Sequence, residues 1–194
     1  VIGDASTSFT LSLENPANLT LADDAAYQGL SGSAGDDQLK GNTSDNIISG
    51  NSGNDVLVGG AGNDRLIAGL GVDRLDGGVG DDTLDVSGKD VVTDTLLGGD
   101  GSDTLIIADG QDISGATITG IETLTGSGTV TVSAAQLAAF DQVEGVEVRI
   151  DGIIIGTDQA DSLTTGEGNQ VIAAAAGDDV IDGGSGFNTY QVIG

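Results

Sequence analysis

The chain has 194 residues, and its 31 acidic against 5 basic side chains give it a formal charge of −26. Nucleic acid and anionic membrane surfaces need a positive footprint, so neither is expected as a partner. The chain contains no His and no Cys, which excludes the catalytic dyads, triads and zinc sites built on those residues, and we expect no enzyme active site here.

Residues 1–31 are expected to form a cap or lead-in coil at the start of the chain. Ser8–Leu13 (SFTLSL) and Asn18–Leu21 (NLTL) alternate polar and apolar residues, which predicts short strands. Asp23–Ser31 places Leu30 in phase with the repeat that follows. A separate ligand site in this segment is the alternative interpretation.

From residue 32 the chain repeats every nine residues with the pattern Gly-Gly-x-Gly-x-Asp-x-aliphatic-x, which is clearest in Gly50–Val58 (GNSGNDVLV) and Gly59–Ile67 (GGAGNDRLI). Three extra residues, Val86–Gly88, interrupt the series before Gly98–Ile106 restores it. The sixth positions are Asp37, Asn46, Asp55, Asp64, Asp73, Asp82, Asp94 and Asp103. The eighth positions are Leu39, Ile48, Leu57, Leu66, Leu75, Leu84, Leu96 and Leu105.

The residue types of this unit predict a turn that binds a hard cation, followed by a short strand. Glycine accepts the positive φ of a sharp turn, and its lack of a side chain lets carbonyl oxygens point inward. Calcium prefers six to eight such oxygens at roughly 2.3–2.6 Å, together with a carboxylate. If units eighteen residues apart stack, the first block forms about five well-made calcium sites. Val92 replaces a glycine in the turn of Asp94, so that site is weaker.

These units resemble the hemolysin-type calcium-binding repeats of RTX proteins, which bacteria export through type I secretion systems. The resemblance implies an all-β fold, a right-handed parallel β-roll or β-solenoid, with calcium between stacked turns. It implies that each ion takes carbonyls from positions one and three with the aspartate of one turn, and carbonyls from positions two and four with the aspartate of the next. The candidate ligands of the first block, residues 32–115, are Gly32, Ala34, Asp37, Gly41, Thr43, Asn46, Gly50, Asn51, Ser52, Gly53, Asp55, Gly59, Gly60, Ala61, Gly62, Asp64, Gly69, Gly71, Asp73, Gly77, Gly78, Val79, Gly80, Asp82, Gly99, Gly101 and Asp103.

Residues 116–155 lack the repeat and are expected to form calcium-poor solenoid coils. Ala116–Ile118, Ile121–Leu124, Thr129–Val132 and Val146–Ile150 read as short strands. Ser133 before AAQLAAF predicts an N-capped helical turn. A structural spacer is the favoured interpretation, and a protrusion that binds a partner or a glycan is the alternative.

A second repeat block, residues 156–194, closes the chain with weaker motifs. Its sixth positions are Asp161, Gln170, Asp179 and Asn188, so two of the four have lost the charge, and we expect one or two ions here. The candidate ligands are Gly156, Asp158, Asp161, Ala175, Gly177 and Asp179. A metal-free continuation of the solenoid is the alternative.

The sequence therefore predicts an extracellular calcium-binding module that is unfolded at cytosolic calcium and folds after secretion. We expect it to be the scaffold of a bacterial surface-layer or adhesin-like protein, whose partners are copies of itself or cell-surface polysaccharide. The alternative is the C-terminal secretion and folding module of an exported enzyme or toxin. An ice- or glycan-binding solenoid is disfavoured because no long Thr-x-Thr ladder is present. No apolar stretch is long enough to span a membrane, Ile153–Ile155 being far too short. Val1 is not an initiator methionine, so we expect a piece of a larger protein.

Overall fold

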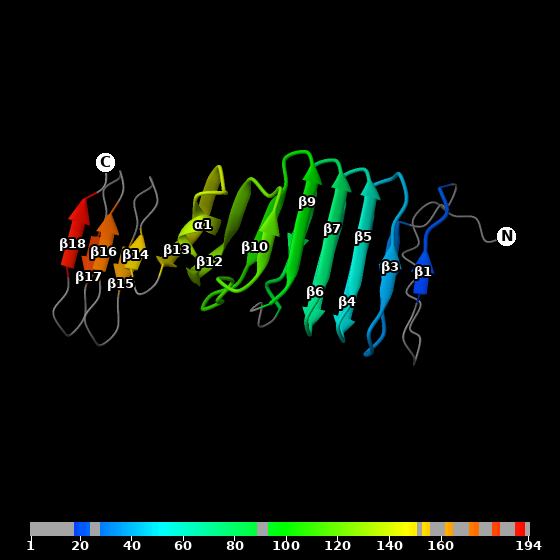
Figure 1. Cartoon of the computed structure of the whole chain (residues 1–194), viewed down its shortest axis with the longest axis horizontal. Coiled ribbons are helices and arrows are strands. Elements are labelled where there is room, and N and C mark those ends of the chain that lie inside the picture. The colour runs from blue at the N-terminus through cyan, green and yellow to red at the C-terminus, as the bar shows by residue number, and fades with distance from the viewer. Residues whose placement is uncertain are drawn as a thin grey trace.

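The computed structural model describes residues 18–23, 28–88, 93–150, 153–155, 162–164, 171–174, 180–182 and 189–192. They form a parallel β-solenoid of about seven turns, as the sequence predicts. The strands stack along the long axis of the molecule, with β1 (Asn18–Thr20) and β18 (Thr189–Val192) at opposite ends (Figure 1). The expected strand at Ser8–Leu13 lies outside the described residues. Among the described residues, no helix is long and apolar enough to cross a membrane.

Through the first repeat block, successive strands alternate between two sheets, because each nine-residue unit supplies one turn and one strand. One sheet has the order β1 (Asn18–Thr20), β3 (Gln38–Lys40), β5 (Val56–Ala61), β7 (Arg74–Val79), β9 (Thr95–Asp100) and β11 (Thr117–Thr119). The other runs β2 (Gly29–Ser31), β4 (Ile47–Ser52), β6 (Arg65–Leu70), β8 (Thr83–Asp85), β10 (Thr104–Ile107), β12 (Thr123–Thr131), β13 (Gln142–Ile150), β14 (Ile153–Ile155), β16 (Val171–Ala174) and β18 (Thr189–Val192). A third sheet pairs β15 (Ser162–Thr164) with β17 (Val180–Asp182).

The register confirms that units eighteen residues apart lie on top of each other. Leu39 of β3 pairs with Leu57 of β5, and Ile48 of β4 pairs with Leu66 of β6. Across the three-residue insertion the offset grows, and Leu75 of β7 pairs with Leu96 of β9. All eight position-eight aliphatics of the first block are at most 1 % exposed, so they form the core between the two sheets.

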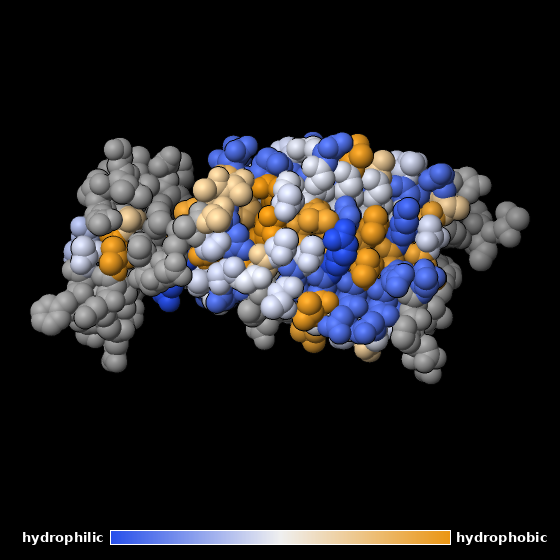
Figure 2. All heavy atoms as spheres, in the orientation of Figure 1, coloured by the Kyte–Doolittle hydropathy of each residue, from blue (hydrophilic) through white to orange (hydrophobic). Residues whose placement is uncertain are grey.

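Residues on the outer faces of the sheets occupy positions seven and nine. On the six-stranded sheet, Val56 of β5 lies beside Arg74 of β7, and Val58 lies beside Asp76. Leu97 of β9 lies on the other side of Asp76. Figure 2 shows this face as apolar over β5 and β9, with a hydrophilic band over β7 between them. The apolar surface is therefore divided by charge and forms no continuous patch on this face.

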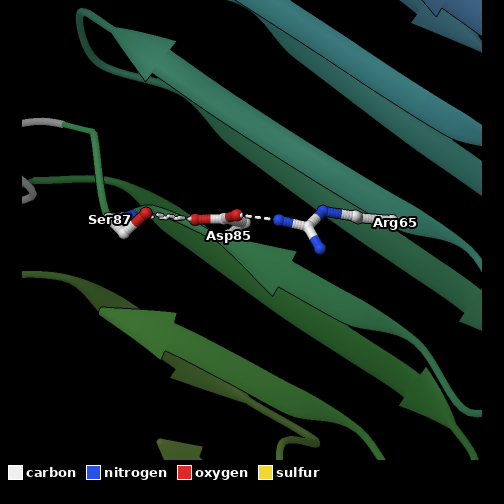
Figure 3. A network of polar contacts seen from close by, with 3 residues as sticks. All are labelled: Arg65, Asp85 and Ser87. Carbon is white, nitrogen blue, oxygen red and sulfur yellow. Dashed lines mark hydrogen bonds and ion pairs between the residues drawn. The ribbon is translucent and has the colours of Figure 1, made fainter. Parts of the chain in front are cut away.

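The three-residue insertion follows β8 and is accompanied by a polar network. The guanidinium of Arg65 donates to Asp85 Oδ2 at 2.5 Å, and the hydroxyl of Ser87 donates to Asp85 Oδ1 at 2.6 Å. The side chain of Asp85 bridges the other two residues (Figure 3). This network closes the end of β8 where the nine-residue period is broken.

The coils between the two repeat blocks differ from the prediction in two respects. The two short strands expected at 121–124 and 129–132 form the single strand β12, which keeps pairing with β13 through a register irregularity between Thr125 and Gly128. In addition, β13 and β14 pair antiparallel, with Ile150 opposite Ile153. Only two residues separate these strands, which is too short for a parallel crossover. Beyond β14, the neighbouring strands of this sheet pair in parallel again.

The predicted helical turn is confirmed as α1 (Ala134–Leu137). Ser133 Oγ accepts the backbone N–H of Gln136, and Gln136 Oε1 accepts the backbone N–H of Ser133, which is a reciprocal capping box. The Gln136 side-chain amide also donates to the carbonyls of Ile113 and Ala116. These bonds tie α1 to the coil that precedes β11.

Strands of the second block fall at positions seven to nine of their units, which confirms the nine-residue phase there. Ser162 of β15 pairs with Val180 of β17, and Val171 of β16 pairs with Thr189 of β18. Ile172 is fully buried, whereas Tyr190 at the equivalent position is 55 % exposed, since β18 is the edge strand of its sheet.

Candidate metal centre

The position-six side chains lie inside the stacked turns, although most of them are carboxylates. All eight of the first block are at most 2 % exposed: Asp37, Asn46, Asp55, Asp64, Asp73, Asp82, Asp94 and Asp103. Moving a carboxylate out of water is costly unless a partner compensates both of its oxygens. The partners of these oxygens therefore decide what the turns can bind.

From Asp55 to Asp103, one oxygen of each position-six side chain holds the preceding coil. Asp55 Oδ1 accepts the backbone N–H of Asp37 at 2.8 Å, and Asp73 Oδ1 accepts that of Asp55 at 2.8 Å. On the opposite edge, Asp82 Oδ1 accepts the backbone N–H of Asp64 at 2.7 Å, and Asp103 Oδ1 accepts that of Asp82 at 2.8 Å. The carboxylates thus form a ladder that joins successive coils along each edge of the solenoid.

The second oxygen is buried without a hydrogen-bond partner in Asp55, Asp64, Asp82 and Asp103. Burial, opposed in part by the backbone hydrogen bond, raises the pKa of Asp55 and of Asp82 to about 6 and that of Asp64 to about 7. Burial raises the pKa of Asp103 as well. Neighbouring carboxylates on the same edge raise these pKa values further. A cation between the coils would supply what these oxygens lack.

The position-one glycines show that a carbonyl oxygen converges on each of these orphaned oxygens. A Cβ added to Gly59 would lie closer than 3.0 Å to both Asp64 Oδ2 and the carbonyl oxygen of Gly77 in the next coil. The same pair of contacts arises at Gly50 and Gly77, with the carbonyls of Ala68 and Gly98. Each of these three turns therefore has a cradle of two oxygens that only glycine leaves open.

Positive φ at positions two and four gives these turns their shape. Gly60 has a φ of 121°, and a Cβ there would clash with the carbonyl oxygen of Asn42 in the preceding coil. Asn51, with a φ of 74°, is the single non-glycine residue with positive φ in the described part of the chain. Asparagine tolerates this conformation better than other side chains, which explains how the unit of Gly50 keeps its turn.

Among the described residues, no group of three or more His, Cys, Asp or Glu side chains could hold a metal ion. Side chains alone therefore do not make a site, and carbonyl oxygens have to complete any ligand set. The position-three carbonyls of Leu70, Val79 and Asp100 each accept one hydrogen bond from the preceding coil. A carbonyl has two lone pairs, so each can still bind a cation. Hard oxygens of this kind fit calcium rather than a softer metal.

The first two turns differ from the others. Asp37 Oδ2 accepts the backbone N–H of Ser33 at 2.5 Å, and Asn46 Oδ1 accepts the backbone N–H of Asn42 at 2.8 Å. The second- and fourth-position residues of these turns, Ser33, Gly35, Asn42 and Ser44, do not have positive φ. Both position-six side chains are therefore satisfied within their own turns.

The structure brings the predicted ligands of the first block together along two edges. One edge stacks the turns that contain Asp37, Asp55 and Asp73. The other stacks the turns that contain Asn46, Asp64, Asp82 and Asp103. Their role as calcium ligands stays a prediction, as does the number of ions. The second-block candidates Gly156, Asp158, Asp161, Ala175, Gly177 and Asp179 lie outside the described residues, and so do Gln170 and Asn188.

A sequence model of the RTX calcium-binding nonapeptide repeat matches residues 30–57, 49–84, 93–113 and 155–190, which together make up more than half of the chain. The chain belongs to this RTX repeat family. It is a calcium-binding structural β-roll module. No curated protein matches it. The matched RTX segments stop at residue 113 and resume at 155, so the coils of β12 and β13 lie outside the recognised repeats.

Sequence reasoning treated position five of the RTX unit as variable, but the structure gives it a role. The side chains of Asp36, Asp45, Asn54, Asn63 and Asp81 each accept the backbone N–H of position five in the following coil. The signal was present, since Asp or Asn recurs at this position. Gly98, the position-one glycine of its RTX turn, was also missed. Only Gly99 and Gly101 of that turn were predicted as ligands.

Proposed function

We propose that this module is an extracellular scaffold that folds when calcium binds between its stacked turns. The observation that carries the proposal is the set of buried carboxylate oxygens of Asp55, Asp64 and Asp82, which have no hydrogen-bond donor. In the pair of turns with the most complete motif, Gly59, Ala61 and Asp64 of one coil and Gly78, Gly80 and Asp82 of the next would hold the ion. When bound, calcium supplies the positive charge that these interior turns lack.

The charge balance of the chain explains why folding would depend on calcium. At a formal charge of −26, the unfolded and folded chains both repel themselves, but folding also brings carboxylates into the interior. Extracellular calcium modules bind with dissociation constants of roughly 10⁻⁴–10⁻³ M. At ten times the dissociation constant each independent site contributes about 1.4 kcal/mol, so several sites amount to a substantial part of a domain's stability.

Secretion and surface placement follow as finer proposals. RTX repeats are typical of proteins exported by type I systems, and low cytosolic calcium would keep the module unfolded for passage. We infer a scaffold in a surface-layer or adhesin-like protein, with copies of itself or surface polysaccharide as partners. The division expected from the sequence favours this proposal: a cap at 1–31, calcium blocks at 32–115 and 156–194, and a calcium-poor stretch at 116–155 between them. Enzyme-linked modules are expected to be shorter and continuous.

The second candidate is the C-terminal folding module of an exported enzyme or toxin. Its support is the family match alone, because the RTX roll is a structural module and does not itself indicate what kind of protein contains it. The protein that contains this chain distinguishes the two candidates. A neighbouring hydrolase or toxin domain would eliminate the scaffold proposal, whereas calcium-dependent sheets or cell-surface attachment of the whole protein would support it.

Circular dichroism against free calcium tests the folding proposal directly. We expect a weak β signal in excess chelator and a cooperative rise as calcium reaches the range of roughly 10⁻⁴–10⁻³ M. Magnesium at the same ionic strength is the matched control. Its octahedral preference and slow dehydration mean that the oxygens of such turns bind it poorly. A full β signal in chelator, unchanged by calcium, would overturn the proposal.

A further inference from the structure

Beyond the last complete repeat, one edge of the solenoid continues its carboxylate ladder to Glu122. Glu122 Oε2 accepts the backbone N–H of Asp103 at 2.8 Å. This is the contact that Asp103 Oδ1 makes with the backbone N–H of Asp82, also at 2.8 Å. The strands agree, since β12 stacks on β10 with Thr104 opposite Thr123 and Leu105 opposite Leu124. Glu122 therefore occupies position six of the next coil.

The oxygen cradle of the repeat turns is also present at this coil. Asp103 is fully buried, and its Oδ2 has no hydrogen-bond partner. A Cβ added to Gly98 would clash with both Asp103 Oδ2 and the carbonyl oxygen of Gly120. In the repeat, Gly59 has the same relation to Asp64 Oδ2 and to the carbonyl oxygen of Gly77. Gly120 has a φ of 61° and lies against Gly99, which places its carbonyl over the turn.

The opposite edge shows that the ladder need not continue. There the backbone N–H of Thr117 donates to the carbonyl of Asp94 at 2.8 Å, so Ala116 occupies position six of the next coil. Alanine offers no side-chain oxygen. In the first coil after the repeat, position six is thus Ala116 on one edge and Glu122 on the other. Both residues lie outside the segments matched by the family.

Hydrogen bonding within the chain does not account for the pair of carboxylates. Glu122 is partly buried, and its Oε2 has the Asp103 N–H as a donor, but Asp103 Oδ2, at the cradle shared with the Gly120 carbonyl, has no donor. Ion pairs in the described residues join Arg65 to Asp85 and Arg74 to Asp76, and none reaches Asp103 or Glu122. Two carboxylates in adjacent coils and a glycine carbonyl between them are a ligand set for a hard divalent cation.

We propose that Asp103 and Glu122, with the carbonyl of Gly120, hold a further calcium ion one coil beyond the recognised repeats. The proposal rests on the proposed function, because it extends the same mode of binding to a turn without the repeat motif. The series ends there, since the backbone N–H of Asp141 donates to the carbonyl of Glu122 at 2.7 Å but the side chain of Asp141 is exposed. The ion would join the calcium-rich block to the coils of β12 and β13.

The test is the number of calcium ions bound at saturation, measured by equilibrium dialysis and metal analysis. The variant is Glu122→Gln, which keeps an oxygen for the Asp103 N–H but removes the charge. Glu144→Gln is the matched control, because Glu144 is an exposed residue of β13 and its replacement removes the same charge. We expect the Glu122→Gln chain to bind one ion fewer than both the wild-type and the Glu144→Gln chain.

Equal numbers of ions in the two variants would overturn this site and leave the proposed function intact. A wild-type chain that binds no calcium would overturn both proposals. If Glu122→Gln fails to fold, long-wavelength anomalous diffraction from wild-type crystals grown with calcium decides the question. A peak between Asp103 and Glu122 supports the site, whereas peaks between Asp64 and Asp82 without one at Asp103 overturn it.

Discussion

The two oxygens of a position-six aspartate have different roles in the interior turns. In Asp64, one oxygen accepts the Asn46 N–H and holds the coils in register, while the other is buried without a donor. In the first turn, Ser33 satisfies the equivalent oxygen of Asp37. The second oxygen of a position-six aspartate therefore has a hydrogen-bond donor in the first turn, whereas in the turn of Asp64 it has none and can bind a cation.

The substitution Asp64→Asn separates these two roles. The amide side chain keeps an oxygen for the Asn46 N–H but removes the charge that two neighbouring sites would share. Since ligand charge sets the affinity of a calcium site, we expect the calcium concentration for half-maximal folding to rise by about tenfold, or ~1.4 kcal/mol. Circular dichroism titrations with calcium measure this midpoint.

Asp45→Asn is the control for this experiment. Asp45 is exposed, and its Oδ1 accepts the Asn63 N–H, a hydrogen bond that asparagine preserves. Its variant loses the same charge from the same edge without touching a buried oxygen, so its midpoint should stay close to that of the wild type. Equal shifts in the two variants would mean that general charge, and not the turn interior, controls folding.

At the scale of whole turns, two side-chain ladders clamp each coil from opposite directions. Position-five side chains accept the N–H of the following coil, as Asn54 does from Val72. Position-six side chains accept the N–H of the preceding coil, as Asp73 does from Asp55. The backbone amides of the turns are thereby satisfied without metal, which leaves the carbonyl oxygens as the groups that a cation can use.

The polar network after β8 lies where an insertion would otherwise loosen the stack. Asp85 is buried to 10 % side-chain exposure, and Arg65 reaches it from β6 in the adjacent coil (Figure 3). Arg74 makes an ion pair with Asp76 on the other sheet, but there the carboxylate side chain is 32 % exposed. Because its carboxylate is buried, breaking the Arg65–Asp85 pair should cost more stability than breaking the Arg74–Asp76 pair.

We therefore expect Arg65→Met to destabilise the calcium-bound module more than Arg74→Met. Methionine keeps most of the side-chain volume, but the first change leaves Asp85 with the Ser87 hydroxyl and N–H as its remaining donors. The expected loss in the free energy of unfolding is about 1–3 kcal/mol for Arg65→Met and at most ~1 kcal/mol for Arg74→Met. Urea unfolding at saturating calcium measures both values.

A double change tests whether the buried carboxylate is the cause. Adding Asp85→Asn to Arg65→Met removes the unpaired charge, so we expect it to recover part of the lost stability. A double variant that is less stable than either single variant would assign the effect to lost packing of the arginine stem instead.

The strands of the repeat could be predicted from sequence because one position decides each of them. An aliphatic side chain every nine residues, as at Leu57 and Leu66, can be buried only if the chain coils with that period. The junction of β13 and β14 was not predictable in this way. No periodic residue marks the stretch between Ile150 and Ile153, and the antiparallel pairing there depends on the length of the connection.

The predicted site was limited by what a motif can encode. Asp64 and Gly59 follow from the pattern, because the glycine permits the turn and the acid fits the cation. Whether a given acid already has its hydrogen-bond donors depends on neighbours such as Ser33, which stands at position two, where the pattern has glycine. Glu122 was missed for a different reason. It reaches position six through the stacking of β12 on β10, while the sequence around it has lost the repeat.

For the whole molecule, the thin core contributes little to the stability of the solenoid, whereas neutralising the carboxylates along its two edges contributes much. The core of the first block is one file of aliphatics per sheet, from Leu39 to Leu105, while the turns on both sides bury carboxylates. Protons and calcium ions both neutralise these carboxylates, so they compete for the same groups. The stability of the metal-free module and its affinity for calcium should therefore respond to pH in opposite directions.

In excess chelator, we expect the module to become more stable as the pH falls from about 7.5 to about 5. The pKa values of Asp55, Asp64 and Asp82 are raised from 3.8 to about 6 or 7 in the folded chain, so over this range the folded state binds more protons than the unfolded state. The destabilisation is complete above the folded pKa values and is lost as the pH falls through them. Calcium needs the ionised carboxylates, so its affinity should fall over the same range.

Two titrations measure these opposite slopes. By circular dichroism, the β signal in chelator should rise as the pH falls from about 7.5 to about 5, and the further gain in β signal on adding saturating calcium should shrink over the same range. Asp64→Asn is the internal control, because it removes the group with the highest of these pKa values and should flatten both slopes. A β signal in chelator that falls with decreasing pH would show that the unpaired oxygens are not what limits the metal-free fold.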